Sequence, residues 1–409
     1  MSDPAPIPVL LGREKASLGS RWTRRALIGA TAGAAAAALV GCGGDKPDDP
    51  GDRPEASPVP SPSSPLPPLA SPVAGFLDPA RWRGRSLTVA SQGGSYQQAQ
   101  DAAYFGPFQV ATGATVSQDT TVLGELRRQV DDEAVQWDLV CLPTEDVLPL
   151  ARDGYLRPVD YGVVDDSVLF SETGIVMQYG VGADFFSTVI IGPPDPTTAA
   201  LTWADVWDTA AGVPARSLRR YPAGTMEFAL IADGVPLGDL YPLDVERAFV
   251  SLGRIAPNVA VWYEDSKQPV ELVVNGEVGL ASAWNVRTTL PDARGQVGIS
   301  WAGGMLSGDS WVVPAGAPNA DVAMSLISYA TRAVPTANFS RLIPFGPVNR
   351  EALALLTPGE WEVLPTSEAH MAVQFVENWN YWVDNRERLS RRFDAWLESA
   401  RRGADEPPP

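Results

Sequence analysis

The chain has 409 residues, of which 45% are hydrophobic, so it can bury a substantial core and its length suggests two or three domains. Its formal net charge is −18, from 49 acidic residues against 31 basic ones. A chain this acidic repels phosphate backbones and anionic membrane surfaces, so its charge excludes a typical nucleic-acid-binding protein and favours cationic ligands.

The N-terminal segment has the features of an export signal. Arg24 and Arg25 precede the small and apolar residues 26–40, and a Gly-Cys pair ends in Cys42. The apolar run is shorter than the roughly 20 residues of a membrane span and fits the h-region of a secretory signal; a buried core helix, the alternative, would need an amphipathic face. The arginine pair resembles a twin-arginine export signal, and LVGC resembles the bacterial lipobox. We predict a signal peptide over residues 1–41 and a lipid anchor on Cys42.

The next segment predicts a tether. Residues 42–80 are rich in Pro, Ser, Gly and Asp, and cannot bury enough apolar surface to offset the chain entropy. Residues 403–409 form a similar tail. If Cys42 carries lipid, Cys141 is the one remaining cysteine and no disulfide forms within the chain. Because Cys141 lies in the strand-like run WDLVCLP, we expect a buried structural thiol.

The first part of the predicted folded body alternates strands and helices. We expect strands over 87–90, 114–118 and 137–142. Ser95 and Gln98 have the spacing of a capping box at the start of a helix, and Thr144 has the position of a cap on another. Such alternation predicts a parallel sheet covered by helices.

A second αβ region follows. Thr202 precedes a predicted helix, residues 243–255 are amphipathic, and the strand VGLASAW ends at Trp284. The strands QVGISW and SWVVP bracket GGMLSGDSW, residues 303–311, which we predict to be a glycine-rich turn. The carboxy-terminal segment is predicted to be helical, with core or docking residues at Trp379, Trp382, Leu389, Phe393, Trp396 and Leu397.

The sequence lacks the parts of most catalytic sites. His370 is the single histidine and has no neighbouring cysteine, so we expect an ordinary surface or helix residue. We expect no metal and no cofactor, because no nucleophile elbow, P-loop, zinc motif or complete dinucleotide fingerprint is present. A protein without enzymatic activity is therefore predicted. An exported hydrolase that works through carboxylates alone is the remote alternative.

Polar and aromatic residues follow four predicted strands, at 92–96, 143–145, 284–285 and 307–309. In open α/β sheets, ligands bind beyond the carboxyl ends of strands. Each residue also has a structural alternative, since Ser95 could cap a helix and Asp309 could close a turn. Together the four strand ends predict a convergent cleft.

Several segments resemble the spermidine/putrescine-binding proteins, the solute receptors of bacterial ABC importers. They are GGSYQ, WDLV, NGEVGLASAWN, GGMLSGDSWVVPAGAPNADVAMSLISYATR and IPFGPVN, within residues 85–355. The resemblance implies an α/β, type II periplasmic-binding-protein fold with two hinged lobes and a ligand cleft between them. It assigns 81–186 and 311–402 to lobe 1 and 187–310 to lobe 2. Residues 183–190 and 310–314 are where the chain is expected to cross between the lobes.

The resemblance also implies roles for individual residues. Trp284 matches the tryptophan that packs on the ligand's methylene chain, and Asp309 matches the aspartate that pairs with an ammonium. Phe345 stands where a tyrosine is common, Ser307 replaces an aromatic, and Glu227 is what remains of the lobe 2 acidic clamp. The expected ligand-binding residues are Gln92, Ser95, Tyr96, Thr144, Glu145, Glu227, Trp284, Asn285, Asp309 and Phe345.

The resulting hypothesis is a monomeric receptor, exported and lipid-anchored, that faces the periplasm or cell exterior. It would bind a polyamine or related small amine, deliver it to ABC permease subunits, and touch the membrane only through Cys42. The alternative is the same fold with a zwitterion, such as an amino acid, a GABA-like compound or a betaine. This alternative is favoured by the predicted helix start at Ser95, whose free N–H groups suit a carboxylate.

Overall fold

The computed structural model describes residues 79–405 apart from 211–213 and 291–292. The predicted signal peptide, the anchor at Cys42 and nearly all of the tether lie outside these residues. The described strands are β1 (Ser86–Ser91), β2 (Thr115–Thr120), β3 (Leu139–Pro143), β4 (Leu156–Arg157), β5 (Val176–Met177), β6 (Gly180–Gly192), β7 (Arg216–Arg219), β8 (Val259–Tyr263), β9 (Leu280–Trp284), β10 (Gly298–Pro314) and β11 (Phe375–Val376). The described α-helices are α1 (Pro79–Trp82), α2 (Gly94–Gln100), α3 (Gly106–Thr112), α4 (Leu123–Asp131), α5 (Thr144–Arg152), α6 (Trp203–Val206), α7 (Pro222–Ala232), α8 (Val245–Ile255), α9 (Gln268–Val274), α10 (Ala320–Ala330), α11 (Ala333–Leu342), α12 (Pro358–Trp361), α13 (Glu368–Met371) and α14 (Trp379–Asp405).

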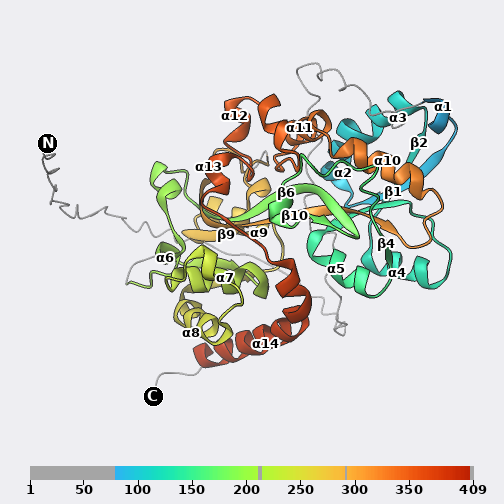
Figure 1. The fold of residues 1–409 in the computed structure, drawn as a ribbon. Coiled ribbons are helices and arrows are strands. Elements are labelled where there is room, and N and C mark those ends of the chain that lie inside the picture. The colour runs from blue at the N-terminus through green and yellow to red at the C-terminus, as the bar shows by residue number, and fades with distance from the viewer. Residues whose placement is uncertain (1–78, 211–213, 291–292, 406–409) are drawn as a thin grey trace, which may run out of the picture. The chain divides into compact units, whose positions relative to one another are not determined.

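Two groups of parallel strands are joined by two long antiparallel ones. The sheet order is β2-β1-β3-β10-β6-β9-β7-β8. The strands β1, β2 and β3 are parallel, as are β7, β8 and β9, whereas β10 is antiparallel to both β3 and β6. Figure 1 shows β6 and β10 side by side between the two groups. The predicted parallel strands are therefore confirmed within each group, and the whole sheet is mixed because β6 and β10 are antiparallel to their neighbours. We call the β1–β3 group with its helices lobe 1 and the β7–β9 group with its helices lobe 2.

The helix after β1 begins differently from the prediction. Its cap is Gly93, with φ of 74°, and not Ser95, which lies inside α2 with 1% of its surface exposed. The Gly93 N–H donates to the side-chain oxygen of Gln97 at 3.0 Å. Glycine suits this backbone conformation, which other residues adopt rarely. The predicted Ser95–Gln98 capping box is therefore wrong, and the Ser95 hydroxyl is left for another role.

The prediction for Thr144 is also wrong, for a related reason. Pro143 precedes α5 and offers no side-chain cap, and Thr144 is the first helical residue. Its hydroxyl lies 2.8 Å from the Ser310 hydroxyl on β10, in a fully buried position. Thr144 therefore ties α5 to the sheet instead of capping its own helix. Thr202, by contrast, does form the predicted cap, in a capping box with Asp205.

The glycine-rich stretch 303–311 is a strand, so the predicted turn is wrong. It lies inside β10, which pairs with β6 along most of its length, with register shifts after Ser300 and Asp309. The glycines serve close packing: a Cβ added at Gly308 would lie 2.5 Å from the Asp184 carbonyl oxygen. A glycine-rich run is a turn signal from sequence alone, but a neighbouring backbone this near also demands glycine.

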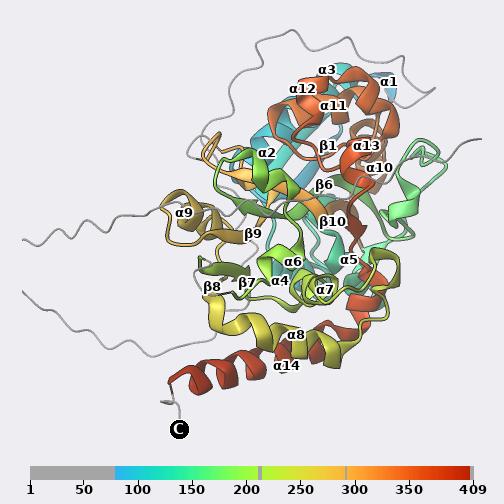
Figure 2. The ribbon, with the colours of Figure 1, turned by 90° about the vertical axis from the view of Figure 1, so that its left-hand side faces the viewer.

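Helix α14 bridges the two lobes. Arg386 pairs with Asp146 on α5 at 2.9 Å, and Arg392 pairs with Glu246 on α8 at 2.6 Å. Figures 1 and 2 both show α14 beside α8. The predicted core residues of α14 are confirmed, because they are buried, with Trp396 partly so. None of the helices among the described residues is long and apolar enough to cross a membrane.

Candidate ligand-binding site

One face of the crossing strands brings polar and apolar side chains together. In the register of β6 and β10, Asp184 faces Asp309, Phe186 faces Ser307, and Thr188 faces Met305. Residues two apart on a strand point to the same side, so these six side chains share one face, which we call the shared face. It runs from lobe 1 at the aspartates to lobe 2 at Thr188, whose partner on β9 is Trp284.

The lobe 1 end of the shared face is acidic. Asp184 and Asp309 are both fully buried. The Tyr96 hydroxyl donates a hydrogen bond to Asp184 and lies 3.3 Å from the Cys141 sulfur. Burial, followed by the charge of Asp184, raises the pKa of Tyr96 well above its usual value, so the phenol keeps its proton. Cys141 is a free and buried thiol, as predicted.

Aromatic rings connect this acidic end to lobe 2. The Tyr96 ring centroid lies 5.2 Å from that of Phe345, and Phe345 lies 6.2 Å from Phe186. Phe186 in turn lies 5.2 Å from Trp284. Three residues expected from the sequence, Tyr96, Phe345 and Trp284, thus belong to one continuous aromatic wall. Phe186 completes it.

The lobe 2 end of the wall is basic. The guanidinium carbon of Arg219 lies 4.6 Å from the Tyr221 ring centroid and 5.3 Å from that of Trp284. Arg219 forms no hydrogen bond or ion pair through its side chain with any residue that the structure describes. The fully buried Arg287 lies 5.8 Å from the Trp284 ring and donates to the Ser266 hydroxyl. Trp284 therefore already stacks with protein cations, and Arg219 is suited to an incoming anion.

Acidic residues also gather where lobe 1 meets lobe 2 and α14. The Tyr221 hydroxyl donates to Glu145 at 3.2 Å, and Arg386 pairs with Glu145 at 3.0 Å. Glu377 accepts a 2.8 Å hydrogen bond from Ser307 on the shared face. Burial and the charge of Glu145 raise the pKa of Glu377 to about 8. Glu145, which was expected in the ligand site, thus contacts Tyr221 of lobe 2 and Arg386 of α14.

Two lobe 1 residues keep polar atoms without hydrogen bonds. Both amide atoms of Gln92 and the Ser95 hydroxyl are buried and form no hydrogen bond in the part of the chain that the structure describes. Buried polar groups are nearly always hydrogen-bonded, so such atoms are suited to a ligand. Gln92 precedes α2 and Ser95 lies in its first turn, next to Tyr96 on the same helix.

Two other expected residues are held by the protein itself. Asn285 accepts a hydrogen bond from the Ser187 N–H at 2.8 Å and donates to the Pro344 carbonyl at 3.2 Å. Glu227 accepts hydrogen bonds from the Gly224 N–H, the Tyr241 hydroxyl and the Trp382 indole at 2.8, 2.6 and 2.8 Å. Asn285 therefore positions the loop beside Trp284, and Glu227 joins α7 to α14.

Comparisons with known proteins identify the family. The family model described as bacterial extracellular solute-binding protein matches residues 103–369. The chain is 32% identical over 330 residues to a gamma-aminobutyric acid-binding protein of Pseudomonas aeruginosa, covering 78% of this chain and 93% of that protein. It is 24% identical over 269 residues to the spermidine/putrescine-binding periplasmic protein of Escherichia coli, covering 60% and 72%. The solved structure of a GABA receptor matches with a TM-score of 0.69 and 34% identity, over 76% of this chain and 98% of that one.

The chain belongs to the bacterial extracellular solute-binding protein family. The type II periplasmic-binding-protein fold expected from the sequence is confirmed. The family is one of ABC substrate-binding receptors and not of enzymes, and its extracellular character implies an exported protein.

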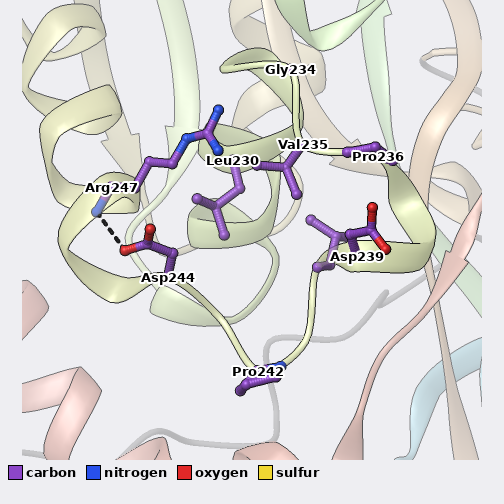
Figure 3. A pocket seen from close by; sticks show the side chains of 9 residues that line it. Leu230, Gly234, Val235, Pro236, Asp239, Pro242, Asp244 and Arg247 are labelled. Atoms are coloured by element: carbon purple, nitrogen blue, oxygen red, sulfur yellow. Dashed lines mark hydrogen bonds between the residues drawn. The ribbon is translucent and has the colours of Figure 1, made fainter.

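The described residues also form a hollow that lies away from the shared face. It measures about 270 Å³ and lies in lobe 2, between the end of α7 and the start of α8, next to Leu230, Pro242 and Arg247 (Figure 3). Arg247 already pairs there with Asp233 at 2.5 Å. No group of three or more acidic, cysteine or histidine side chains among the described residues could hold a metal ion.

Asp184, Phe186, Arg219, Tyr221 and Glu377 were not among the site residues expected from the sequence. Asp184 and Phe186 lie in the segment that was predicted to cross between the lobes, so alternation along that strand could have indicated them. Arg219 and Tyr221 lie a few positions before Glu227, the residue that the resemblance assigned to the acidic clamp. No local pattern indicates Glu377, because it comes from the C-terminal segment.

Proposed function

We propose that this receptor captures a small zwitterion, an ω-amino acid with an ammonium and a carboxylate separated by a short apolar chain, and delivers it to an ABC permease. In this binding mode the ammonium pairs with Asp184 and Asp309, and the carboxylate pairs with Arg219. The methylene groups pack on the aromatic wall, and Gln92 and Ser95 supply further hydrogen bonds.

The observation that carries the proposal is Arg219. A guanidinium beside two aromatic rings and without a carboxylate partner among the described residues is suited to an anion, because arginine pairs well with planar carboxylates. A polyamine carries no group that Arg219 would attract. The two buried aspartates at the other end of the wall suit an ammonium, so the site matches a ligand with opposite charges at its two ends.

The relatives support the same ligand class. The P. aeruginosa relative is a gamma-aminobutyric acid-binding protein, and the solved structure is that of a GABA receptor. Both share a larger fraction of identical residues with this chain than the polyamine-binding protein does. The expected polyamine ligand is the second candidate, and it is favoured by the acidic residue Glu145 and by the ionised form of Glu377.

Titration calorimetry tests the choice. The chain without residues 1–41 is titrated at neutral pH with gamma-aminobutyric acid, putrescine and spermidine. The zwitterion proposal predicts saturable heat with gamma-aminobutyric acid and a weaker or absent signal with both polyamines. Tight polyamine binding without gamma-aminobutyric acid binding would contradict the proposal and favour the second candidate.

The anchor is proposed from the sequence. Cys42 after an export signal would tether a monomeric receptor to the membrane by a lipid, with residues 42–80 as spacer. Metabolic labelling with palmitate, compared between the native chain and Cys42→Ala, tests this. Equal label in both chains would contradict the anchor.

A further inference from the structure

Glu377 is fixed beside the shared face by backbone pairing. The strand β11 pairs in parallel with β10 through Met305 and Leu306, and the Glu377 N–H donates to the Leu306 carbonyl at 3.0 Å. The Glu377 carboxyl then accepts the 2.8 Å hydrogen bond from Ser307. Only 6% of the residue is exposed, so its charge state acts inside the site and not in solvent.

Acidic side chains outnumber basic ones around Glu377. Glu145 on α5, Glu227 on α7 and Arg386 on α14 all act electrostatically on Glu377, and so do the neutral phenols Tyr221 and Tyr241 that face it. The one guanidinium of this set is shared, because Arg386 pairs with Glu145 at 3.0 Å and with Asp146 on the same helix. Glu377 therefore has no cation of its own among these neighbours.

A buried carboxyl in such surroundings is neutral at neutral pH. Burial is the main cause that raises the pKa of Glu377 to about 8, and the charge of Glu145 is the second. The neutral form can donate a hydrogen bond to a carboxylate, whereas the ionised form repels it and attracts an ammonium.

We propose that Glu377 is a specificity-determining residue of the ligand site: its neutral form favours a ligand with one ammonium and one carboxylate, and its ionised form favours a ligand with two ammonium groups. The proposal rests on the proposed function, since it concerns the choice between the two ligand classes considered there. It adds to that function that the protonation of Glu377 determines which charge on the ligand the site selects.

Calorimetry at two pH values tests the proposal. Gamma-aminobutyric acid and putrescine are titrated at about pH 6.5 and about pH 9, on either side of the Glu377 pKa of about 8. When the pH rises from about 6.5 to about 9, the neutral fraction of Glu377 falls about tenfold. Gamma-aminobutyric acid should therefore bind about tenfold more weakly at the higher pH, and putrescine should bind more tightly. In Glu377→Gln both changes should shrink to less than about twofold. The matched control is Glu387→Gln, which changes a side chain on α14 that is 84% exposed.

A second measurement does not depend on ligand. Carbon NMR of the carboxyl groups, with Glu377→Gln for assignment, should find one carboxyl that titrates near pH 8. Titration of Glu377 in the ordinary range of about 4 would overturn the proposal. So would equal pH dependence of binding in the native chain and in Glu377→Gln. If Glu377 titrates near pH 8 but neither ligand binds at either pH, the proposed function is overturned and this proposal with it.

Discussion

Asp184 and Asp309 lie directly opposite each other on the two strands that cross between the lobes, and both are fully buried. Two carboxyls that face each other on the face that carries the aromatic wall can share one cationic partner. A ligand ammonium is such a cation. The pair is therefore interpreted as part of the binding site and not of the core alone.

Asp309→Asn should separate binding from stability. The change removes one of two neighbouring carboxylates but keeps the hydrogen bond from Tyr96 to Asp184. We expect the free energy of unfolding to change by less than about 1 kcal/mol or to rise, because a like-charge contact is relieved. Affinity for gamma-aminobutyric acid should fall at least about tenfold, since an ammonium loses a charged partner. Urea unfolding and calorimetry measure the two effects, with the exposed Asp153→Asn as control. Unchanged affinity would contradict the assignment of Asp309.

Arg219→Gln should change which ligand binds. The variant keeps a polar side chain between Tyr221 and Trp284 but loses the charge. Affinity for gamma-aminobutyric acid should fall about tenfold to a hundredfold, and affinity for putrescine should stay equal or rise, because a repelling cation is removed. The neighbouring Arg220, which pairs at the surface with Glu264 and Asp394, provides the control Arg220→Gln. Equal losses for both ligands would show that Arg219 supports the site without contacting a carboxylate.

The sequence predicted the fold better than the site. The strands near 87–90 and 137–142 carry apolar runs that mark buried strands, and they form β1 and β3. The stretch 303–311 was wrongly predicted to be a turn, because its glycine content reflects close packing against a neighbouring strand that is distant in sequence. The same stretch predicted Asp309 as a ligand-binding residue, but its neighbour Asp184 depends on strand register, which a sequence pattern does not give.

Three nearby arginines show why site residues are harder to predict. Arg216, Arg219 and Arg220 lie within five positions, and local pattern alone treats them alike. Arg216 is 1% exposed and donates to backbone carbonyls, Arg219 lies between aromatic rings, and Arg220 forms surface ion pairs. Their three environments are created by lobe 2 packing, by Trp284 and by α14. Only the folded chain distinguishes them.

Arg216→Met should destabilise the fold. The Arg216 guanidinium donates to the carbonyl of Val206 at 2.9 Å, to that of Pro214, and to that of Asp205 at 3.3 Å. Methionine fills a similar volume but leaves these carbonyls without donors, so we expect a loss of about 3 kcal/mol in the free energy of unfolding. Urea unfolding measures it. Arg254→Met, at a side chain that is 55% exposed, should cost less than about 1 kcal/mol. Similar values for both variants would contradict a structural role for Arg216.

Glu227→Gln distinguishes a structural acid from a ligand-binding one. The Glu227 carboxyl accepts three hydrogen bonds that join α7 to Tyr241 and Trp382, and glutamine can accept with only one oxygen. We expect the free energy of unfolding to fall by about 1–3 kcal/mol. The affinity for gamma-aminobutyric acid should change less than about threefold.

The pH dependence of stability gives Glu227 a second signature. Burial raises the pKa of the folded Glu227 above the value of 4.5 that applies to the unfolded chain. The folded protein thus holds a proton that the unfolded chain has lost, and this contribution to stability is complete below about pH 4.5 and is lost as the pH rises through the folded pKa. Urea unfolding at several pH values above 4.5 should show a steeper decline in the native chain and in the exposed control Glu398→Gln than in Glu227→Gln, in which the raised pKa of Glu377 still causes a decline. If the Glu227→Gln chain keeps both its stability and its pH profile but loses ligand affinity, Glu227 is instead a ligand-binding residue.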